Sequence, residues 1–184
     1  ASRIRVADAA VFCTTIASVP GSGHILSEAF DRLPYDARKI PRLADHFPAL
    51  QPVSHFSDLL ARKIYTYNSA SAIIAYLGWW LGYDDLAEAA CDPQISRLLD
   101  RNSQAINPVL CRLYACQPDE QQQFALQAKS KFQNQAIRDS IQRNARQPQR
   151  KLARAERLVG PALLIEQSGG DFAVLALAAA AALL

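Results

Sequence analysis

The chain has 184 residues, of which 50% are hydrophobic and 20% are charged. This composition excludes an intrinsically disordered chain, because enough apolar surface can be buried to offset the entropy of ordering. Its 7 glycines and 10 prolines exclude a collagen-like or mucin-like sequence. The net charge of +3 permits an anionic partner but does not require one.

The ends of the sequence indicate a piece of a longer product. The chain begins at Ala1 and contains no methionine at all. At the other end, the apolar run over residues 172–184 is shorter than the roughly 20 residues of a membrane span. It predicts a buried helix without a C-cap signal. We therefore expect a processed or partial chain, truncated at its C-terminus.

Four cysteines in a chain of this size do not form a disulfide framework. We therefore expect a reducing compartment and a cytoplasmic location, with no signal peptide at the N-terminus. Cys111 and Cys116 have no histidine near them in the sequence, so we expect no zinc site.

Residues 1–55 are predicted to be a lead-in of irregular and β structure. Residues 3–15 mix β-branched and small apolar side chains, which favours a strand. The run Val19-Pro20-Gly21-Ser22-Gly23 is typical of a loop. Four prolines at positions 34, 41, 48 and 52 then interrupt the apolar pattern.

Residues 56–184 are predicted to be helical almost throughout, which makes the fold class mainly α. The longest helix is expected over 57–83, with Ser57 as its N-cap and Asp58 in its first turn. Asp92-Pro93 is typical of an N-cap and first turn. The further helices are expected over 93–102, after Pro108, over 118–132, over 137–144, and after Pro148 and Pro161.

One face of the longest predicted helix combines polar and small side chains. At about 100° per residue, Lys63, Tyr67 and Ser71 share this face and Asn68 lies at its edge. Small residues at positions 75, 78 and 82 continue it. The stripe fits close packing of another helix. It also fits a substrate lying beside an ammonium and an amide, where a lysine of lowered pKa can act as a base.

Two sequence blocks stand out in the helical part of the chain. The first block is Arg62-Lys63-Ile64-Tyr65-Thr66-Tyr67-Asn68 with residues 72–78, and the second comprises residues 131–134, 137–139, Arg143 and 146–152. Together these blocks resemble the polyol-specific long-chain dehydrogenases. The second block, with its Arg-x-Pro-x-Arg-Lys-Leu run, is most similar to the mannitol-1-phosphate branch of that family.

The resemblance implies a multi-helical substrate domain like the C-terminal domain of 6-phosphogluconate dehydrogenase. It implies an NAD-dependent enzyme without a metal that interconverts a polyol or polyol phosphate and a ketose or ketose phosphate. Lys63 stands at the position of the general base, and Asn68 at the position of the group that polarises the reacting oxygen. Ser71 occupies the position of the family's histidine, and a serine cannot titrate near neutral pH.

The resemblance also implies an N-terminal Rossmann domain that binds NAD. The sequence Gly21-Ser22-Gly23 lacks the third glycine of a dinucleotide fingerprint and follows a proline. We therefore expect the Rossmann domain to be missing, apart from a tail of it within residues 1–55. The chain alone is then expected to be inactive.

A basic run extends from Arg138 to Arg157. Its arginines fit a solvated helix surface, and we expect this for Arg138, Arg154 and Arg157. For Arg146, Arg150 and Lys151 the family resemblance favours contact with a polyol or sugar phosphate. The guanidinium group of arginine suits phosphate because it can donate two hydrogen bonds to two of its oxygens. Without interleaved aromatic residues, a nucleic-acid partner is not expected, nor is a membrane partner.

Two classes of function stay open at the sequence level. The first is the catalytic and substrate-binding domain of a polyol dehydrogenase. The second is a helical binding or interaction module of dehydrogenase descent that has lost catalysis, which the serine at position 71 favours.

The adjacent Trp79 and Trp80 are expected to pack in the core or between domains.

Overall fold

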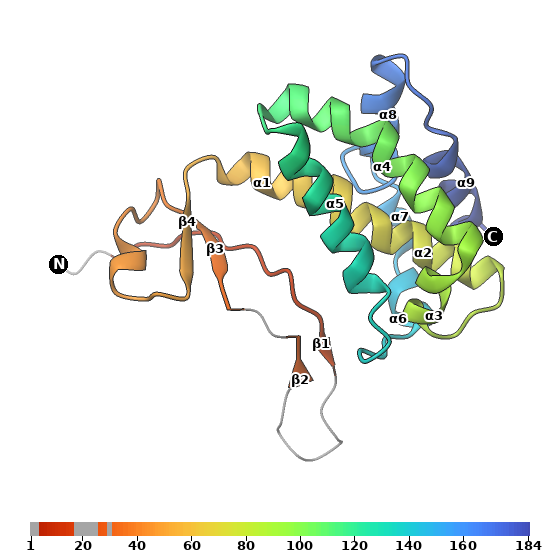
Figure 1. Cartoon of the computed structure of the whole chain (residues 1–184), viewed down its shortest axis with the longest axis horizontal. Helices are drawn as coiled ribbons and strands as arrows, with labels where there is room; N and C mark the ends of the chain where they lie inside the picture. Colours follow the sequence, from red (N-terminus) through yellow and green to blue (C-terminus); the bar gives the residue numbers. More distant parts are fainter. Residues whose placement is uncertain (1–3, 17–25, 29–30) are drawn as a thin grey trace. The chain divides into compact units, whose positions relative to one another are not determined.

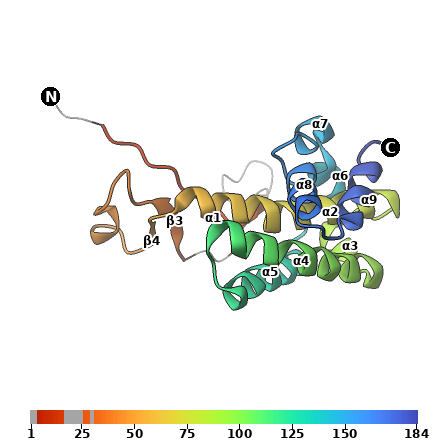
Figure 2. The ribbon, with the colours of Figure 1, turned by 90° about the horizontal axis from the view of Figure 1, so that it is seen from above.

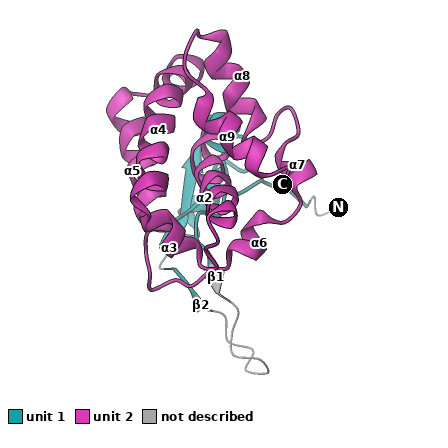
Figure 3. Ribbon diagram, turned by 90° about the vertical axis from the view of Figure 1, so that its right-hand side faces the viewer, with its two compact units in different colours: residues 1–61 teal, residues 62–184 magenta. Residues whose placement is uncertain are grey.

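A computed structural model gives the structure of the chain and describes residues 4–16, 26–28 and 31–184 (Figure 1). The chain divides into two compact units, Ala1–Ala61 and Arg62–Leu184 (Figure 3). The predicted loop over 19–23 lies outside the described residues.

The first unit contains two pairs of short strands. Strand β1 (Thr15–Ile16) pairs antiparallel with β2 (Leu26–Ser27), and β3 (Leu33–Asp36) pairs parallel with β4 (Leu50–Val53). A short 3₁₀ helix, η1 (Leu43–Asp45), lies between β3 and β4 in the chain.

The strand predicted over 3–15 is wrong for most of its length. Residues 4–14 contain one isolated bridge, between Ala9 and Tyr35, and a regular strand begins only at Thr15. A strand needs a neighbour to satisfy its backbone groups. In β3 the amide of Asp36 donates to the carbonyl of Asp8, and the carbonyl of Pro34 accepts from the amide of Ala10, while the side chains of Ile4 and Val6 are exposed.

The second unit is helical, which confirms the mainly α fold class. Helix α1 (Phe56–Lys63) has its last two residues in the second unit. A π-helical turn, η2 (Ile64–Asn68), then connects it to α2 (Ser69–Trp80). The remaining helices are α3 (Leu86–Cys91), α4 (Pro93–Tyr114), α5 (Pro118–Phe132), α6 (Ile141–Ala145), α7 (Pro148–Lys151), α8 (Val159–Gln167) and α9 (Ala173–Ala181).

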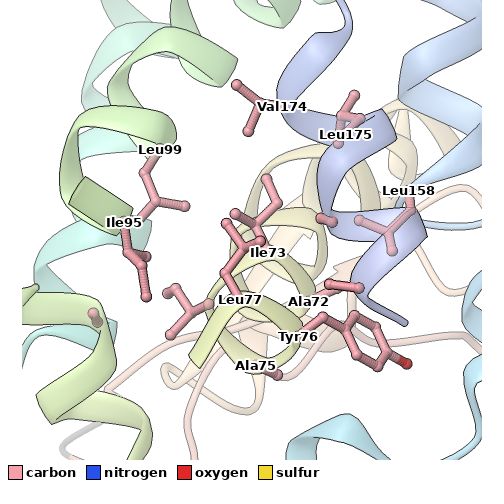
Figure 4. Packing of buried hydrophobic residues seen from close by; sticks show 14 of the residues in the cluster. Ala72, Ile73, Ala75, Tyr76, Leu77, Ile95, Leu99, Leu158, Val174 and Leu175 are labelled. Carbon is pink, nitrogen blue, oxygen red and sulfur yellow. The ribbon is translucent and has the colours of Figure 1, made fainter. Parts of the chain in front are cut away.

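Helix α2 forms the centre of this unit. It lies between a layer of α3, α4 and α5 and a second layer of α6 to α9 (Figure 2). Its side chains from Ala72 to Gly78 are all buried, as expected for a helix that is apolar around its whole circumference. Ile73 and Leu77 belong to the same buried cluster as residues of α4 and α9 (Figure 4).

The stripe of small residues on α2 serves close packing at Gly78. A Cβ atom at this position would lie 2.8 Å from the Cβ of Ala89 in α3 and 2.8 Å from the Cδ1 of Ile141 in α6. Ordinary van der Waals contact needs more room, so only glycine allows both helices to approach this closely. Ala75, one turn earlier, is fully buried.

Helix α4 corrects a prediction of two separate helices. It runs without interruption from Pro93 to Tyr114 and contains Pro108 in its interior. A proline there removes one backbone hydrogen bond and crowds the preceding turn. Ile106, Val109 and Leu110 are buried on both sides of it, and this packing offsets the cost. The start at Asp92-Pro93 is confirmed, since Asp92 accepts hydrogen bonds from the amides of Gln94 and Ile95.

Helix α6 is shorter than the predicted helix over 137–144. It begins at Ile141, where the Ser140 hydroxyl accepts a hydrogen bond from the amide of Arg143. This N-cap fixes the start of the helix and leaves residues 137–139 outside it.

Trp79 and Trp80 are not core residues of the helical unit. Their side chains are 53% and 60% exposed, respectively, at the C-terminal end of α2. Core packing is therefore wrong for both residues, and packing between domains stays a prediction. No helix within the described ranges is long and apolar enough to cross a membrane.

Candidate functional site

A π-helical turn interrupts the helix that carries the predicted catalytic residues. Sequence periodicity predicts one regular helix over 57–83, but Ile64–Asn68 adopts the wider π conformation. The amide of Ser69 donates to the carbonyl of Ile64, five residues earlier. Such turns occur mostly as single insertions in α-helices, and frequently at functional sites.

The π turn changes which residues face the same way. In a regular α-helix, positions five apart differ by about 140° around the axis. The i to i+5 hydrogen bonding of the π turn widens the helix and reduces this angle between Lys63 and Asn68. Ser71 follows Asn68 at helical spacing. The three side chains are all half-buried.

Tyr67 does not belong to this face, which corrects the face predicted from Lys63, Tyr67 and Ser71. Its side chain is buried, and its ring meets Phe124 of α5 edge to face at a centroid distance of 4.9 Å. A uniform 100° per residue could not have shown this, because it assumes an α-helix through the turn.

A buried hydrogen-bond network holds the π turn on both sides. Gln121 of α5 is fully buried and accepts a hydrogen bond from Nε of Arg62 at 2.8 Å. Its amide nitrogen donates to Oγ1 of Thr66 at 3.0 Å and to Oδ1 of Asn107 at 3.2 Å. One side chain therefore connects the residue before Lys63 with the middle of the π turn.

Arg62 is the charged member of this network and is almost completely buried. Its Nη1 donates to Glu120 at 2.8 Å, and its guanidinium lies 5.2 Å from the centroid of the Phe124 ring. The charge and two of its donors are therefore satisfied within the helical unit, which a buried guanidinium requires.

A second polar region is a pocket of about 220 Å³ lined mainly by cationic side chains, called the cation pocket below. It lies where α2 faces α6, α7 and the segment before α8. Its lining residues are Ser71, Ala72, Arg143, Asn144, Arg146, Arg150, Lys151 and Arg157.

The backbone between α6 and α7 sets the direction of these cations. Helix α6 ends at Ala145, and Gln147 adopts a left-handed conformation with φ of 58°. Pro148 then starts α7 with its fixed φ. The reversal places Arg146 and Arg150 on the same pocket, and Nε of Arg150 donates to Oε1 of Gln147 at 2.9 Å.

Lys151 is the buried cation of the pocket, with 6% of its surface exposed. Its ammonium donates to the carbonyl of Asn144 and lies 5.5 Å from the centroid of the Tyr76 ring. Burial first, and the positive charges of Arg157, Arg150 and Arg146 second, lower the pKa of Lys151 to about 8. The lysine is therefore charged at neutral pH but close to its titration range.

The pocket carries more positive charge than the surrounding carboxylates balance. Arg143 pairs with Asp139, and Nε of Arg157 lies 3.0 Å from a carboxylate oxygen of Glu156. Arg146 donates to the carbonyl of Arg143, and in the described ranges no carboxylate pairs with it. A region of this kind attracts anions.

The structure brings four of the six predicted site residues together, namely Ser71, Arg146, Arg150 and Lys151. Lys63 and Asn68 do not line the cation pocket but precede Ser71 in the run of α1, η2 and α2. Lys63 is about 12 Å from Ser71 along the axis, at 1.5 Å per residue. Whether these six residues act on a substrate stays a prediction.

Sequence reasoning missed Arg157, Arg143 and Asn144 as pocket residues. Arg157 was expected on a solvated surface, but its side chain is only 15% exposed and lines the pocket. No periodic pattern could reveal this, because residues 152–158 form no regular helix. Arg138 and Arg154 are exposed, as expected.

The described residues contain no dinucleotide-binding unit of the Rossmann type. NAD sites of the Rossmann type need a strand, a glycine-rich turn and a helix N-terminus in succession. The parallel strands β3 and β4 are joined through a 3₁₀ turn, and no such unit occurs in the described part of the chain. That part also contains no group of three or more side chains able to hold a metal ion.

The model of the mannitol dehydrogenase C-terminal domain family matches residues 55–184. The chain therefore belongs to this family.

The relatives of the chain include several mannitol-1-phosphate 5-dehydrogenases. The protein from Brevibacillus brevis is 35% identical over 77% of this chain and 38% of its own length. The protein from Pyricularia oryzae is 30% identical over 99% of this chain and 46% of its own length. The chain thus spans less than half of these relatives.

A solved structure has the same fold. The chain matches mannitol 2-dehydrogenase from Pseudomonas fluorescens, a ternary complex with NAD and D-mannitol, with a TM-score of 0.76 and 18% identity. The match covers 95% of this chain and 38% of the other.

Proposed function

We propose that this chain is the substrate-binding and catalytic part of an NAD-dependent oxidoreductase. The reaction would interconvert a polyol phosphate and a ketose phosphate, such as mannitol 1-phosphate and fructose 6-phosphate. The observation that carries this proposal is the cation pocket beside the helix of Lys63 and Asn68. The mannitol-1-phosphate 5-dehydrogenases among the relatives support it.

The cation pocket supports a phosphorylated substrate over a neutral polyol. A neutral polyol needs mixed donors and acceptors, whereas this pocket presents guanidinium groups of Arg146 and Arg150 and the ammonium of Lys151. A planar guanidinium can donate two hydrogen bonds to two oxygens of one phosphate, and the buried Lys151 would add a further charged donor. The phosphate would then anchor the substrate while its carbon chain extends along the helix toward Asn68.

Lys63 and Asn68 would perform the proton chemistry. In the oxidation direction, the amine of Lys63 accepts the proton of the reacting hydroxyl as the carbonyl forms, and in reverse it returns that proton. The amide of Asn68 donates a hydrogen bond to the same oxygen and stabilises its developing charge. Ser71 would contribute one hydrogen bond at the entrance to the pocket.

The hydride acceptor, NAD, would be held mainly by a Rossmann domain outside this chain, because the described residues offer no site for it. Residues 1–55 would then be a lead-in between that domain and the helical substrate domain of residues 56–184. The chain by itself would bind sugar phosphate without turnover.

The proposal is tested with a longer polypeptide in which this chain follows its native upstream sequence. NADH oxidation is measured with fructose 6-phosphate for the parent and for Lys63→Ala. We expect a loss of about 10²- to 10⁴-fold in kcat, the usual contribution of a general acid or base. Lys39→Ala, at an exposed lysine of the first unit, is the matched control. Undiminished turnover in Lys63→Ala contradicts the proposed role.

A binding module without catalysis is the second candidate, and the serine at position 71 favours it. Sugar phosphate binding by the longer polypeptide, without any NADH oxidation, would support this module over the enzyme. Ser71→His restores the family's titratable group at this place. Turnover that appears or rises in this variant would support an impaired enzyme.

A further inference from the structure

Two cysteines meet where α4 ends and the chain turns toward α5. Cys111 lies in the last turn of α4, and Cys116 follows the helix end in the connection. Ala115 between them has a φ of 46°, in the left-handed region, and this reverses the chain direction. The two sulfur atoms are 3.5 Å apart.

We propose that Cys111 and Cys116 form a redox modification site that closes reversibly to an intrachain disulfide. The oxidant would be a low-molecular-weight disulfide such as oxidised glutathione. Both thiols are only half-buried, so a small disulfide can reach them. This proposal is independent of the proposed dehydrogenase function.

The exchange proceeds in two balanced steps. The thiolate of Cys116 attacks one sulfur of the oxidant, which forms a mixed disulfide and releases one thiol. The thiolate of Cys111 then attacks the Cys116 sulfur and releases the second thiol. The two cysteines lose two protons and two electrons, and the small disulfide becomes two thiols.

Local chemistry assigns the first attack to Cys116. Burial first, and its hydrogen bond with Cys116 second, raise the pKa of the Cys111 thiol to about 11. Cys111 therefore supplies little thiolate for an encounter with the oxidant. Once Cys116 carries the mixed disulfide, Cys111 is already within 3.5 Å of the sulfur that it must attack. A disulfide requires a sulfur separation of about 2.05 Å, so side-chain rotation must close the remaining gap.

Within the described residues, neither of the other two cysteines contacts a second sulfur. Cys91 is exposed, and its sulfur lies 3.6 Å from the carbonyl of Gln133 and 3.7 Å from the amide of Gln135. Cys13 belongs to the first unit. These two cysteines serve as internal controls, because a general oxidation would modify them equally.

The site also borders the network that holds the π turn. The Cys116 sulfur lies 4.0 Å from Oε1 of Gln121, the same atom that accepts from Arg62. Closure of the disulfide removes the S–H donor from this oxygen. The redox state of the pair therefore acts directly on a residue that contacts both Arg62 and Thr66.

The test uses the chain under native conditions with oxidised glutathione, followed by alkylation of the remaining thiols and trypsin digestion. Trypsin cleaves after Arg112, which separates the two cysteines into peptides 102–112 and 113–129. We expect these peptides to be joined, with a combined mass lower by two hydrogen atoms, and to separate after treatment with dithiothreitol. Cys13 and Cys91 should be alkylated.

Cys91→Ser should leave the joined peptide unchanged, and Cys116→Ser should abolish it while Cys111 stays alkylated. A matching circular dichroism spectrum establishes that each variant is folded. Free alkylation of both Cys111 and Cys116 in the oxidised sample overturns the proposal, as does cross-linking to Cys13 or Cys91 at a comparable yield.

Discussion

Arg62 and Arg146 occupy opposite electrostatic environments in one helical unit. Arg62 is 8% exposed and is bound by Gln121 and Glu120 beside the Phe124 ring. Arg146 is exposed, and its Nε donates to a backbone carbonyl, that of Arg143. The chain itself satisfies the first charge and leaves the second charge facing a pocket.

This difference separates stability from binding. A buried charge with several partners of its own holds the surrounding structure in place, and removal of one partner is expensive. A charge that faces a pocket with other cations contributes little to folding, but it is available to an anionic ligand. Variants around Arg62 should therefore lower the free energy of unfolding, and variants around Arg146 should lower the affinity for an anionic ligand.

The largest expected effect is the destabilisation by Gln121→Leu. The substitution leaves Arg62 without one acceptor and removes the donor to Thr66 and Asn107 in a buried region. We expect the free energy of unfolding to fall by about 3 kcal/mol, as for other broken buried networks. Urea unfolding followed by circular dichroism measures this. Gln127→Leu, at an exposed position of the same helix, is the control.

A loss below about 0.5 kcal/mol in Gln121→Leu would show that this network does not hold the helix, since that is the range of ordinary surface substitutions. The stabilising role that we assign to the surroundings of Arg62 would then be wrong.

The next largest effect is a loss of sugar phosphate affinity in Arg146→Ala. A charge-assisted hydrogen bond contributes about 1.5–3 kcal/mol, so the affinity for fructose 6-phosphate should fall about tenfold to a hundredfold. The unfolding free energy should be unchanged within about 0.5 kcal/mol. Titration calorimetry and urea unfolding measure the two quantities on one sample. A loss of stability without a loss of affinity would reverse the roles assigned to the two regions.

A smaller effect is the pH dependence that Lys151 gives to binding. The pKa of Lys151 is about 8, below the ordinary value of 10.5, because of burial first and the neighbouring arginines second. Below pH 8 the ammonium is charged and favours an anion, so affinity should decrease as the pH rises through 8. In Lys151→Met this decrease should disappear. A pH profile of affinity that is identical in both proteins would contradict the assignment.

The same lysine gives folding stability the opposite pH trend. Because the pKa in the folded chain is lower than the ordinary value of 10.5, the unfolded chain binds more protons between the two pKa values. Stability should therefore rise from pH 8 toward 10.5, by at most about 1.4 kcal/mol per pH unit from this one group. Urea unfolding of the parent chain and Lys151→Met across this range measures the difference.

The smallest effect is expected for Arg154→Ala. Arg154 belongs to the same basic run, but its side chain is exposed and does not line the cation pocket. Affinity for fructose 6-phosphate and unfolding free energy should both match the parent chain, the latter within about 0.5 kcal/mol. If affinity falls as far as in Arg146→Ala, the general charge of the run binds the anion, and the geometry of the pocket does not.

The sequence predicted the helical class because apolar residues recur at helical spacing and because caps such as Asp92-Pro93 are local signals. It did not predict the helix through Pro108, since burial of Ile106 and Leu110 is a property of the tertiary structure. The π turn at Ile64–Asn68 was also not predicted, because Gln121, which contacts Thr66 within this turn, lies far from it in the sequence.

The candidate site shows the same division. Arg146, Arg150 and Lys151 could be proposed because they form one short motif that resembles a known family. Arg157 could not, because only the path of residues 152–158 brings it to the pocket. The lowered pKa of Lys151 likewise depends on burial and on three arginines that surround it in space.

The most direct test of the proposed function is a comparison of fructose 6-phosphate with fructose as ligands of this chain, by titration calorimetry at neutral pH. The cation pocket predicts binding of the phosphorylated sugar, a loss of at least about tenfold for unphosphorylated fructose, and the same loss for fructose 6-phosphate in Arg146→Ala. Equal affinity for the two sugars, or binding unaffected by Arg146→Ala, would contradict a phosphate-binding role for the pocket.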